Sequence, residues 1–146
     1  MGEKKFGAVI NIQGDEPFIQ PEQISKVANL FKDKKVELAT LARKLKNIHD
    51  LTSPNTIKVI IKKKNKAIYF SRTAIPYYRG SDSSDWTQLH TYYKHIGIYG
   101  YRSDILKEVT KLKRSSLEIA ESLEQLRWIE NGYKIAVGFT DFESHS

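Results

Sequence analysis

An apolar stretch that ends in a glycine and two carboxylates most constrains what this chain can fold into. Residues 8–12 read Ala-Val-Ile-Asn-Ile, and they are followed by Gln13, Gly14, Asp15, Glu16 and Pro17. A short, nearly continuous apolar run predicts a strand that is buried on both faces, as in a parallel sheet covered by helices. In open α/β sheets, ligands bind just beyond the carboxyl ends of such strands. The segment therefore predicts an α/β fold with a ligand site next to Gly14 and Asp15.

Asp15 is the candidate metal ligand of this segment. A carboxylate supplies hard oxygen ligands, which suit Mg²⁺ that is held partly by a substrate phosphate. Gly14 allows the backbone to turn sharply or to approach a ligand closely. The alternative is a strand followed by an acidic turn that binds no metal, and these residues alone leave both interpretations open.

The composition predicts a soluble domain that has its own core. The chain has 146 residues, of which 40% are hydrophobic and 28% charged, and it contains neither a membrane-spanning run nor a secretory pattern at its start. We therefore expect no membrane partner. Cysteine is absent, which excludes disulfides and thiolate metal sites and agrees with a reducing, cytoplasmic location. The net charge of +7 favours an anionic partner, unless the lysines only keep the surface soluble.

The predicted elements alternate as in a mixed α/β domain. Apolar spacing and terminal residues predict helices over 21–33, 102–112 and 116–131, the last ended by Asn131 and Gly132. Strands are expected at 37–42, 56–62, 67–72, 92–101 and 133–139, with the second and third paired as a hairpin. Segments 47–55 and 77–90 are expected to be loops, the longer of them a mobile cover over a site.

The predicted strand 92–101 carries a candidate binding face. His95, Tyr99 and Tyr101 alternate with Ile96 and Ile98, so the imidazole and the two phenols should share one face of the sheet. Together they offer several hydrogen bonds to a polyhydroxylated ligand. The alternative is that the same side chains line a solvated or dimer-facing surface.

Two further segments carry candidate ligand contacts. In the predicted helix 116–131, Glu124 falls inside the apolar arc and needs a partner. That partner is either Arg127 in a structural ion pair or, together with Gln125, the hydroxyls of a substrate. Arg72 ends a predicted strand and offers a planar fork to a carboxylate or a phosphate, unless it is an ordinary surface arginine.

Aromatic residues among basic ones raise the possibility of a single-stranded nucleic acid ligand. They are Tyr77, Tyr78, Trp86, Tyr92 and Tyr93. Base stacking on such side chains is a common mode of single-strand recognition. These residues carry no RNA-binding signature, and the chain has no glycine-rich phosphate loop. A basic binding module is therefore kept as an alternative, and no nucleic acid partner is expected.

Five stretches of the chain form a combined pattern. They are Asn-Ile-Gln-Gly-Asp-Glu-Pro at 11–17, Pro-Asn followed by Ile-Lys-Val within 54–59, Ile-Tyr-Phe-Ser-Arg followed by Ile-Pro within 68–76, Lys-His-Ile-Gly-Ile-Tyr at 94–99, and Leu-Glu followed by Ala-Glu-Ser-Leu-Glu-Gln-Leu-Arg within 117–127. In order and spacing they resemble the CMP-Kdo synthetase (3-deoxy-manno-octulosonate cytidylyltransferase) family along nearly the whole chain. The resemblance implies a partial nucleotide-diphospho-sugar transferase (Rossmann-like) fold, with helices flanking a mixed sheet.

The resemblance also implies an activity and roles for individual residues. Family members join CTP to the eight-carbon sugar acid Kdo, giving CMP-Kdo and pyrophosphate for lipopolysaccharide assembly, with Mg²⁺ as cofactor and a homodimer as the assembly. By similarity, Asp15 is a Mg²⁺ ligand and Gln13 lies beside the reacting groups. The implied Kdo contacts are Arg72, His95, Tyr99, Glu124 and Gln125.

The chain departs from the family at both ends. Nothing in it matches the N-terminal strand and loop that bind the nucleotide, or the last C-terminal segment with its second metal-binding aspartate. We therefore expect residues 1–146 to be one domain, the central and C-terminal portion of a cytidylyltransferase, and to release little or no pyrophosphate alone. A cytidylyltransferase for another acidic sugar, such as sialic acid, is the alternative within the same enzyme class.

Overall fold

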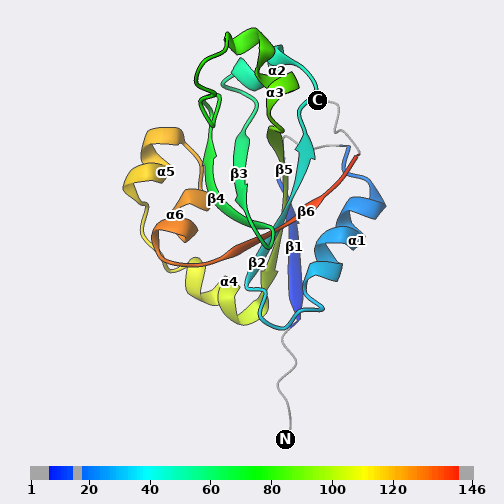
Figure 1. Cartoon of the computed structure of the whole chain (residues 1–146). Coiled ribbons are helices and arrows are strands. Elements are labelled where there is room, and N and C mark those ends of the chain that lie inside the picture. Colours follow the sequence, from blue (N-terminus) through cyan, green and yellow to red (C-terminus); the bar gives the residue numbers. More distant parts are fainter. Residues whose placement is uncertain (1–6, 15–17, 142–146) are drawn as a thin grey trace, which may run out of the picture.

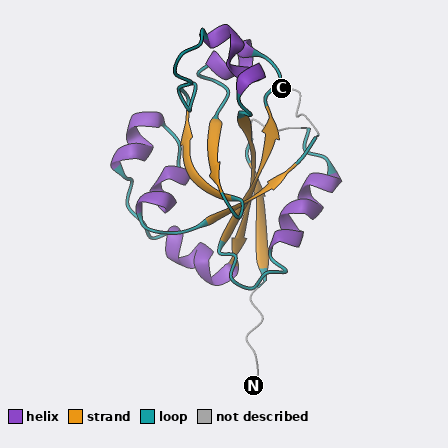
Figure 2. Cartoon of the chain, in the orientation of Figure 1, coloured by secondary structure: helices purple, strands orange, loops and turns teal. Residues whose placement is uncertain are grey.

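The computed structural model describes residues 7–14 and 18–141, which form a six-stranded sheet flanked by helices (Figure 1). The strands are β1 (Ala8–Ile12), β2 (Leu38–Lys44), β3 (Lys58–Lys62), β4 (Lys66–Ser71), β5 (Tyr93–Arg102) and β6 (Ile135–Phe139). The helical elements are α1 (Pro21–Leu30), α2 (Ile48–Thr52), η1 (Ser83–Asp85), α3 (Trp86–Leu89), α4 (Ser103–Val109), α5 (Ser116–Glu121) and α6 (Gln125–Glu130). The mixed α/β prediction is confirmed (Figure 2).

The strand order is β1-β5-β2-β6-β4-β3, with a further short pairing between β3 and β5. Only β2 and β6 run parallel; the other pairs recorded in the described sheet are antiparallel. The prediction that residues 8–12 form a strand buried on both faces in a parallel sheet is wrong. Strand β1 pairs antiparallel with β5 at the edge of the described sheet, and both Val9 and Ile12 are 41% exposed. A strand with a single neighbour retains exposed surface even when its sequence is apolar.

The two faces of the sheet separate as the alternation in β5 predicts. Tyr99 and Tyr101 belong to a cluster formed with α4 and α6, and His95 packs against it through Phe70; we call this the aromatic face. Ile96 and Ile98 pack with Leu41 and with Val27 of α1 on the opposite, aliphatic face. In Figure 1, α1 lies on one side of the sheet and α4, α5 and α6 on the other. A smaller cluster, with Leu51 of α2 and Trp86 of α3, covers one end of the sheet.

Close backbone packing on the aliphatic face requires a glycine. A Cβ atom placed on Gly100 of β5 would lie 2.5 Å from the Phe31 ring and 2.7 Å from Val27. Helix α1 therefore packs directly against the main chain of β5. The helices of the described ranges are too short or too polar to cross a lipid bilayer.

Three local predictions need correction. The segment 116–131 is two helices, because Ser122 adopts a left-handed conformation with φ of 55° and ends α5. The expected loop 47–55 contains α2, which begins where the Asn47 side chain accepts a hydrogen bond from the Asp50 backbone N–H at 2.9 Å. The expected loop 77–90 contains η1 and α3, since Trp86 is buried there. The hairpin of β3 and β4 is confirmed.

Candidate functional site

The middle of β5 brings the predicted binding residues of the aromatic face together. The His95 ring lies 5.2 Å from the Tyr99 ring and 5.0 Å from the Phe70 ring of β4, measured between centroids. His95 is 5% exposed and Tyr99 is 3% exposed. The alternative of a solvated tyrosine and histidine surface is therefore wrong. The imidazole and the phenol are therefore buried polar groups within the packed core of the aromatic face.

His95 is held by a hydrogen bond from the neighbouring strand. Its Nε2 lies 2.8 Å from Thr40 Oγ1 of β2, and both side chains are buried. Burial lowers the pKa of His95 to about 3, because the charged imidazolium would lose its hydration. The imidazole is therefore neutral at physiological pH and offers one donor and one acceptor.

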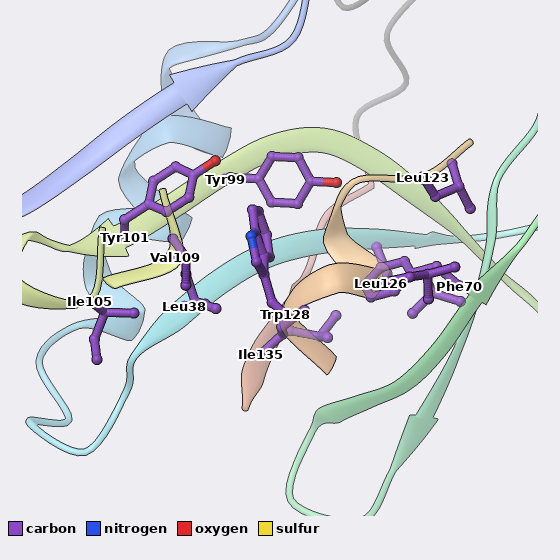
Figure 3. Close-up of a cluster of buried hydrophobic side chains, with 13 residues drawn as sticks. Leu38, Phe70, Tyr99, Tyr101, Ile105, Val109, Leu123, Leu126, Trp128 and Ile135 are labelled. Carbon is purple, nitrogen blue, oxygen red and sulfur yellow. The ribbon is translucent and has the colours of Figure 1, made fainter. Parts of the chain in front are cut away.

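The two tyrosines of the aromatic face pack on an indole. Trp128 of α6 makes edge contacts with Tyr99 and with Tyr101, at ring-centroid distances of 5.2 and 5.5 Å (Figure 3). Burial raises the pKa of Tyr101, and a hydrogen bond with the Asn11 side chain of β1 opposes that shift. These contacts hold α6 against β5. The first residues of α6 therefore lie next to the aromatic face.

Arg72 is neither an open fork nor an ordinary surface arginine. Its guanidinium donates to three backbone carbonyls: Nε to Glu121 at 2.6 Å, Nη1 to Pro54 at 3.0 Å and Nη2 to Ser122 at 3.2 Å. These bonds join the end of β4 to the turn between α5 and α6. Arg72 thus brings its own segment next to Glu124 and Gln125.

Sequence reasoning missed two charged groups in this region, one buried and one half-buried. The Lys58 side chain is fully buried, and its Nζ donates to the carbonyls of Ser53, Thr56 and Arg72 at 2.7, 2.5 and 2.6 Å. Burial lowers the pKa of Lys58 to about 8. A single lysine inside the apolar run 57–61 was the available signal, because an unpaired ammonium is rarely placed in such a run.

Glu121 is the second missed group. Its carboxylate accepts hydrogen bonds from the Arg72 backbone N–H at 2.9 Å and from the Tyr69 hydroxyl at 3.1 Å. Burial acts to raise the pKa of this carboxyl, but these bonds and one from Ser71 outweigh it, so the pKa is lowered. Glu121 is therefore a charged anchor between β4 and α5.

Glu124 does not lie inside an apolar arc, and that expectation is corrected. It immediately precedes α6, its side chain is 59% exposed, and its carboxylate is 3.9 Å from Arg127 Nη1. Arg127 instead forms a two-bond ion pair with Glu118, at 2.8 Å from Nε and 2.5 Å from Nη2. The helical wheel failed because the left-handed Ser122 interrupts the 100° periodicity. Gln125, by contrast, is 2% exposed.

Gln13 also reaches the middle of β5. Its backbone N–H donates to the Gly97 carbonyl at 2.9 Å, and Gly97 lies between His95 and Tyr99 along the strand. The predicted residues Gln13, Arg72, His95, Tyr99 and Gln125 are thus carried by segments that meet around one part of β5, and exposed Glu124 lies at its margin.

The metal prediction rests on a residue outside the described ranges. Asp15 lies between residues 14 and 18, so its carboxylate is not placed. Within residues 7–14 and 18–141, no group of three or more histidine, aspartate or glutamate side chains is arranged to hold a metal ion.

Known proteins share this sequence and this fold. The chain is 52% identical over 143 residues to a 3-deoxy-manno-octulosonate cytidylyltransferase of Parabacteroides distasonis, covering 95% of this chain and 57% of the relative. It is 54% identical over 142 residues to the protein of that name from Cytophaga hutchinsonii, covering 97% of this chain and 56% of the relative. The chain therefore spans little more than half the length of these curated relatives.

A solved structure supports the same relationship. A CMP:2-keto-3-deoxy-manno-octonic acid synthetase in complex with CTP superimposes with a TM-score of 0.82 at 36% identity, covering 92% of this chain and 54% of that one. The family model described as cytidylyltransferase matches residues 3–135. This chain belongs to the cytidylyltransferase family.

Proposed function

We propose that this chain contributes the sugar-acid side of an enzyme that transfers CMP from CTP to Kdo and releases pyrophosphate. The observation that carries the proposal is that the segments that carry Gln13, Arg72, His95, Tyr99 and Gln125 meet around the middle of β5. These residues come from four separate segments of the sequence. Such convergence of hydrogen-bond donors and acceptors suits a ligand that has several hydroxyls and a carboxylate.

The proposed chemistry is positioning and electrostatic stabilisation. A hydroxyl of the sugar attacks the α-phosphorus of CTP in line, and the protein holds the two reactants in that geometry. Exposed Glu124 is suited to accept hydrogen bonds from sugar hydroxyls, and Gln13 is proposed to lie beside the reacting groups. The basic net charge of +7 favours two anionic substrates.

Mg²⁺ is the proposed cofactor, with Asp15 as a ligand. One carboxylate together with phosphate oxygens is a donor set that suits this ion. When bound, Mg²⁺ neutralises charge on the reacting phosphates. The residues described here then have a separate task, which is to bind and orient the sugar acid.

A homodimer in the cytoplasm, serving lipopolysaccharide assembly, completes the proposal. The support for self-association is β1, whose outer edge is exposed together with the side chains of Val9 and Ile12. Exposed apolar strand edges favour pairing with another chain. Light scattering tests this part, and a strictly monomeric chain at high concentration would contradict it.

A segment exchange tests the activity. The matching segment of the Parabacteroides distasonis relative is replaced by residues of this chain, and pyrophosphate release is measured. We expect release only when CTP, Kdo and Mg²⁺ are all present. A folded hybrid that releases no pyrophosphate, beside an active parent protein, would contradict the proposal.

Ligand binding separates the alternatives. By calorimetry, the 146-residue chain is expected to bind Kdo in preference to N-acetylneuraminic acid, which the sialic acid alternative would reverse. A basic nucleic acid module would bind single-stranded RNA at low salt and lose affinity steeply as salt rises. We expect no RNA binding.

A further inference from the structure

Thr40 occupies an irregular position between the two central strands. It is fully buried in β2, where it is paired with Tyr99 of β5, while its neighbour Leu41 is paired with Ile96. One step along β2 thus corresponds to three steps along β5. Such a bulge turns main-chain carbonyls away from the regular ladder, and they need other donors.

The Thr40 hydroxyl supplies a donor to these carbonyls. Its Oγ1 lies 2.7 Å from the Ile98 carbonyl oxygen and 3.3 Å from that of Ile96. A hydroxyl has one hydrogen to donate, and a carbonyl oxygen only accepts. The short distance assigns that hydrogen to Ile98, so Oγ1 has only lone pairs left for a third partner.

The third partner is His95, whose Nε2 lies 2.8 Å from Thr40 Oγ1. Because Oγ1 has already donated its hydrogen, Nε2 must carry a hydrogen and donate it. The imidazole is neutral in this buried position, so its other nitrogen has no hydrogen. The Nδ1 atom is then a hydrogen-bond acceptor.

We propose that Thr40 is a positioning residue that holds His95 in the Nε2–H tautomer, so that His95 accepts a hydrogen bond from a sugar hydroxyl and does not contact the sugar carboxylate. A lone pair on Nδ1 attracts an O–H group and repels a carboxylate oxygen, which can only accept. The sugar contact rests on the function proposed above; the tautomer assignment rests on the hydrogen-bond geometry at Thr40 and on the neutrality of the buried ring.

Two rings restrict the imidazole in addition to Thr40. The Phe70 ring meets it edge-on, at an interplanar angle of 79°, and the Tyr99 ring is tilted by 40°. These contacts limit where the ring lies but do not distinguish its two nitrogens. Among the contacts of the described residues, the hydrogen bond with the Thr40 hydroxyl is the one that distinguishes the two nitrogens.

The test is nitrogen NMR of the imidazoles in the ¹⁵N-labelled chain. In the wild type, His95 should show a protonated-type shift at Nε2 and an unprotonated-type shift at Nδ1. Thr40→Val removes the hydroxyl at nearly constant shape and should give a mixture of tautomers. Thr40→Ser keeps the hydroxyl and should restore the single tautomer. Thr110→Val, whose hydroxyl donates to the Lys107 carbonyl at the end of α4, is the matched control and should leave His95 unchanged.

Two results would overturn the proposal. A wild-type His95 with its hydrogen on Nδ1 would refute the tautomer assignment, and this result does not depend on any variant folding. A folded Thr40→Val chain, checked by circular dichroism, that keeps the wild-type tautomer would refute the positioning role of Thr40.

Titration with Kdo separates this inference from the proposed function. We expect the Nδ1 signal of wild-type His95 to shift on addition of Kdo and not on addition of acetate. If the Nδ1 signal does not shift with saturating Kdo, the proposed sugar contact is refuted. If the Nε2–H tautomer is intact in that experiment, the tautomer assignment still stands. A response to acetate as large as that to Kdo would overturn the preference for a hydroxyl.

Discussion

The two faces of the central sheet share the strand β5 but differ in what their side chains require. On the aliphatic face, Ile96 and Ile98 pack with Leu41 and with Val27 of α1. On the aromatic face, His95 and Tyr99 are just as buried, yet each carries polar atoms. Aliphatic groups need only to be removed from water, whereas buried polar groups also need partners of the right kind and direction.

This difference bears on why the candidate site residues of β5 lie on one face. The aromatic face is surrounded by groups that orient hydrogen bonds, such as the Thr40 hydroxyl and the Arg72 guanidinium. The aliphatic face holds α1 against the backbone at Gly100 and has no such groups in its cluster. The aliphatic face therefore mainly stabilises the sheet, and the aromatic face offers oriented polar groups, as the proposed site requires.

The largest expected effect is on the aliphatic face. Leu41→Ala removes a fully buried side chain and should lower the free energy of unfolding by about 3–4 kcal/mol, measured by urea denaturation. The His95 tautomer should not change. Leu89→Ala is the control, since Leu89 is 48% exposed. Equal losses in the two variants would mean that the aliphatic face is not the main source of stability.

The next effect lies in the helices that cover the aromatic face. Glu118 and Arg127 form a largely buried ion pair between α5 and α6. Glu118→Ala leaves the guanidinium without this partner and should lower the free energy of unfolding by about 2–3 kcal/mol. Thermal and urea denaturation measure the loss. If Glu118→Ala lowers the free energy of unfolding by less than the exposed Glu124→Gln variant does, the ion pair does not stabilise the packing of α5 and α6.

The buried imidazole of the aromatic face should make the free energy of unfolding depend on pH. The pKa of His95 is lowered to about 3 in the folded protein from 6.5, so between these values only the unfolded chain binds the proton. Its contribution to stability is present above pH 6.5 and is lost as the pH falls toward 3, by about 2 kcal/mol between pH 7 and pH 5. His95→Gln should lack this loss in urea titrations at the two pH values.

The control for this measurement is His49→Gln, because His49 is exposed on α2. It should keep the wild-type pH dependence. If the His95 and His49 variants have the same pH dependence, the buried imidazole is not the source of the acid sensitivity.

The smallest effect on stability is expected at Glu124. Its side chain is 59% exposed and its carboxylate is 3.9 Å from Arg127 Nη1, so Glu124→Gln should change the free energy of unfolding by less than about 0.5 kcal/mol. If Glu124 accepts hydrogen bonds from Kdo, the same variant should weaken Kdo binding about tenfold by calorimetry. Glu22→Gln on the first turn of α1 is the control and should leave binding unchanged.

Much of the architecture was predictable because it depends on local patterns. The alternation of His95, Ile96, Ile98 and Tyr99 placed each side chain on the correct face, and the hairpin of β3 and β4 followed from a lysine-rich turn between two β-rich runs. The candidate residues Arg72, His95 and Gln125 were identified from their own segments and again by the resemblance, Gln13 by the resemblance alone, and the segments that carry them do meet. Roles in binding and in metal coordination, including that of Asp15, stay predictions.

Local patterns failed where neighbours distant in sequence decide the outcome. An apolar run at residues 8–12 cannot reveal that its strand lies at the edge of the described sheet. A helical wheel cannot reveal the left-handed Ser122 that turns Glu124 toward solvent and pairs Arg127 with Glu118. In the same way, Arg72 was identified as a fork, but its three carbonyl partners lie 18 to 50 positions away along the chain.

The sequence by itself determined the alternation of elements, the two faces of β5 and the family to which the chain belongs, because periodicity and motif order are properties of neighbouring residues. Only the tertiary structure decided which nitrogen of His95 carries the hydrogen, which carbonyls hold Lys58 and Arg72, and which strand lies at the edge of the described sheet. The physical reason is that a buried polar group is defined by its partners, and folding brings those partners from distant parts of the chain.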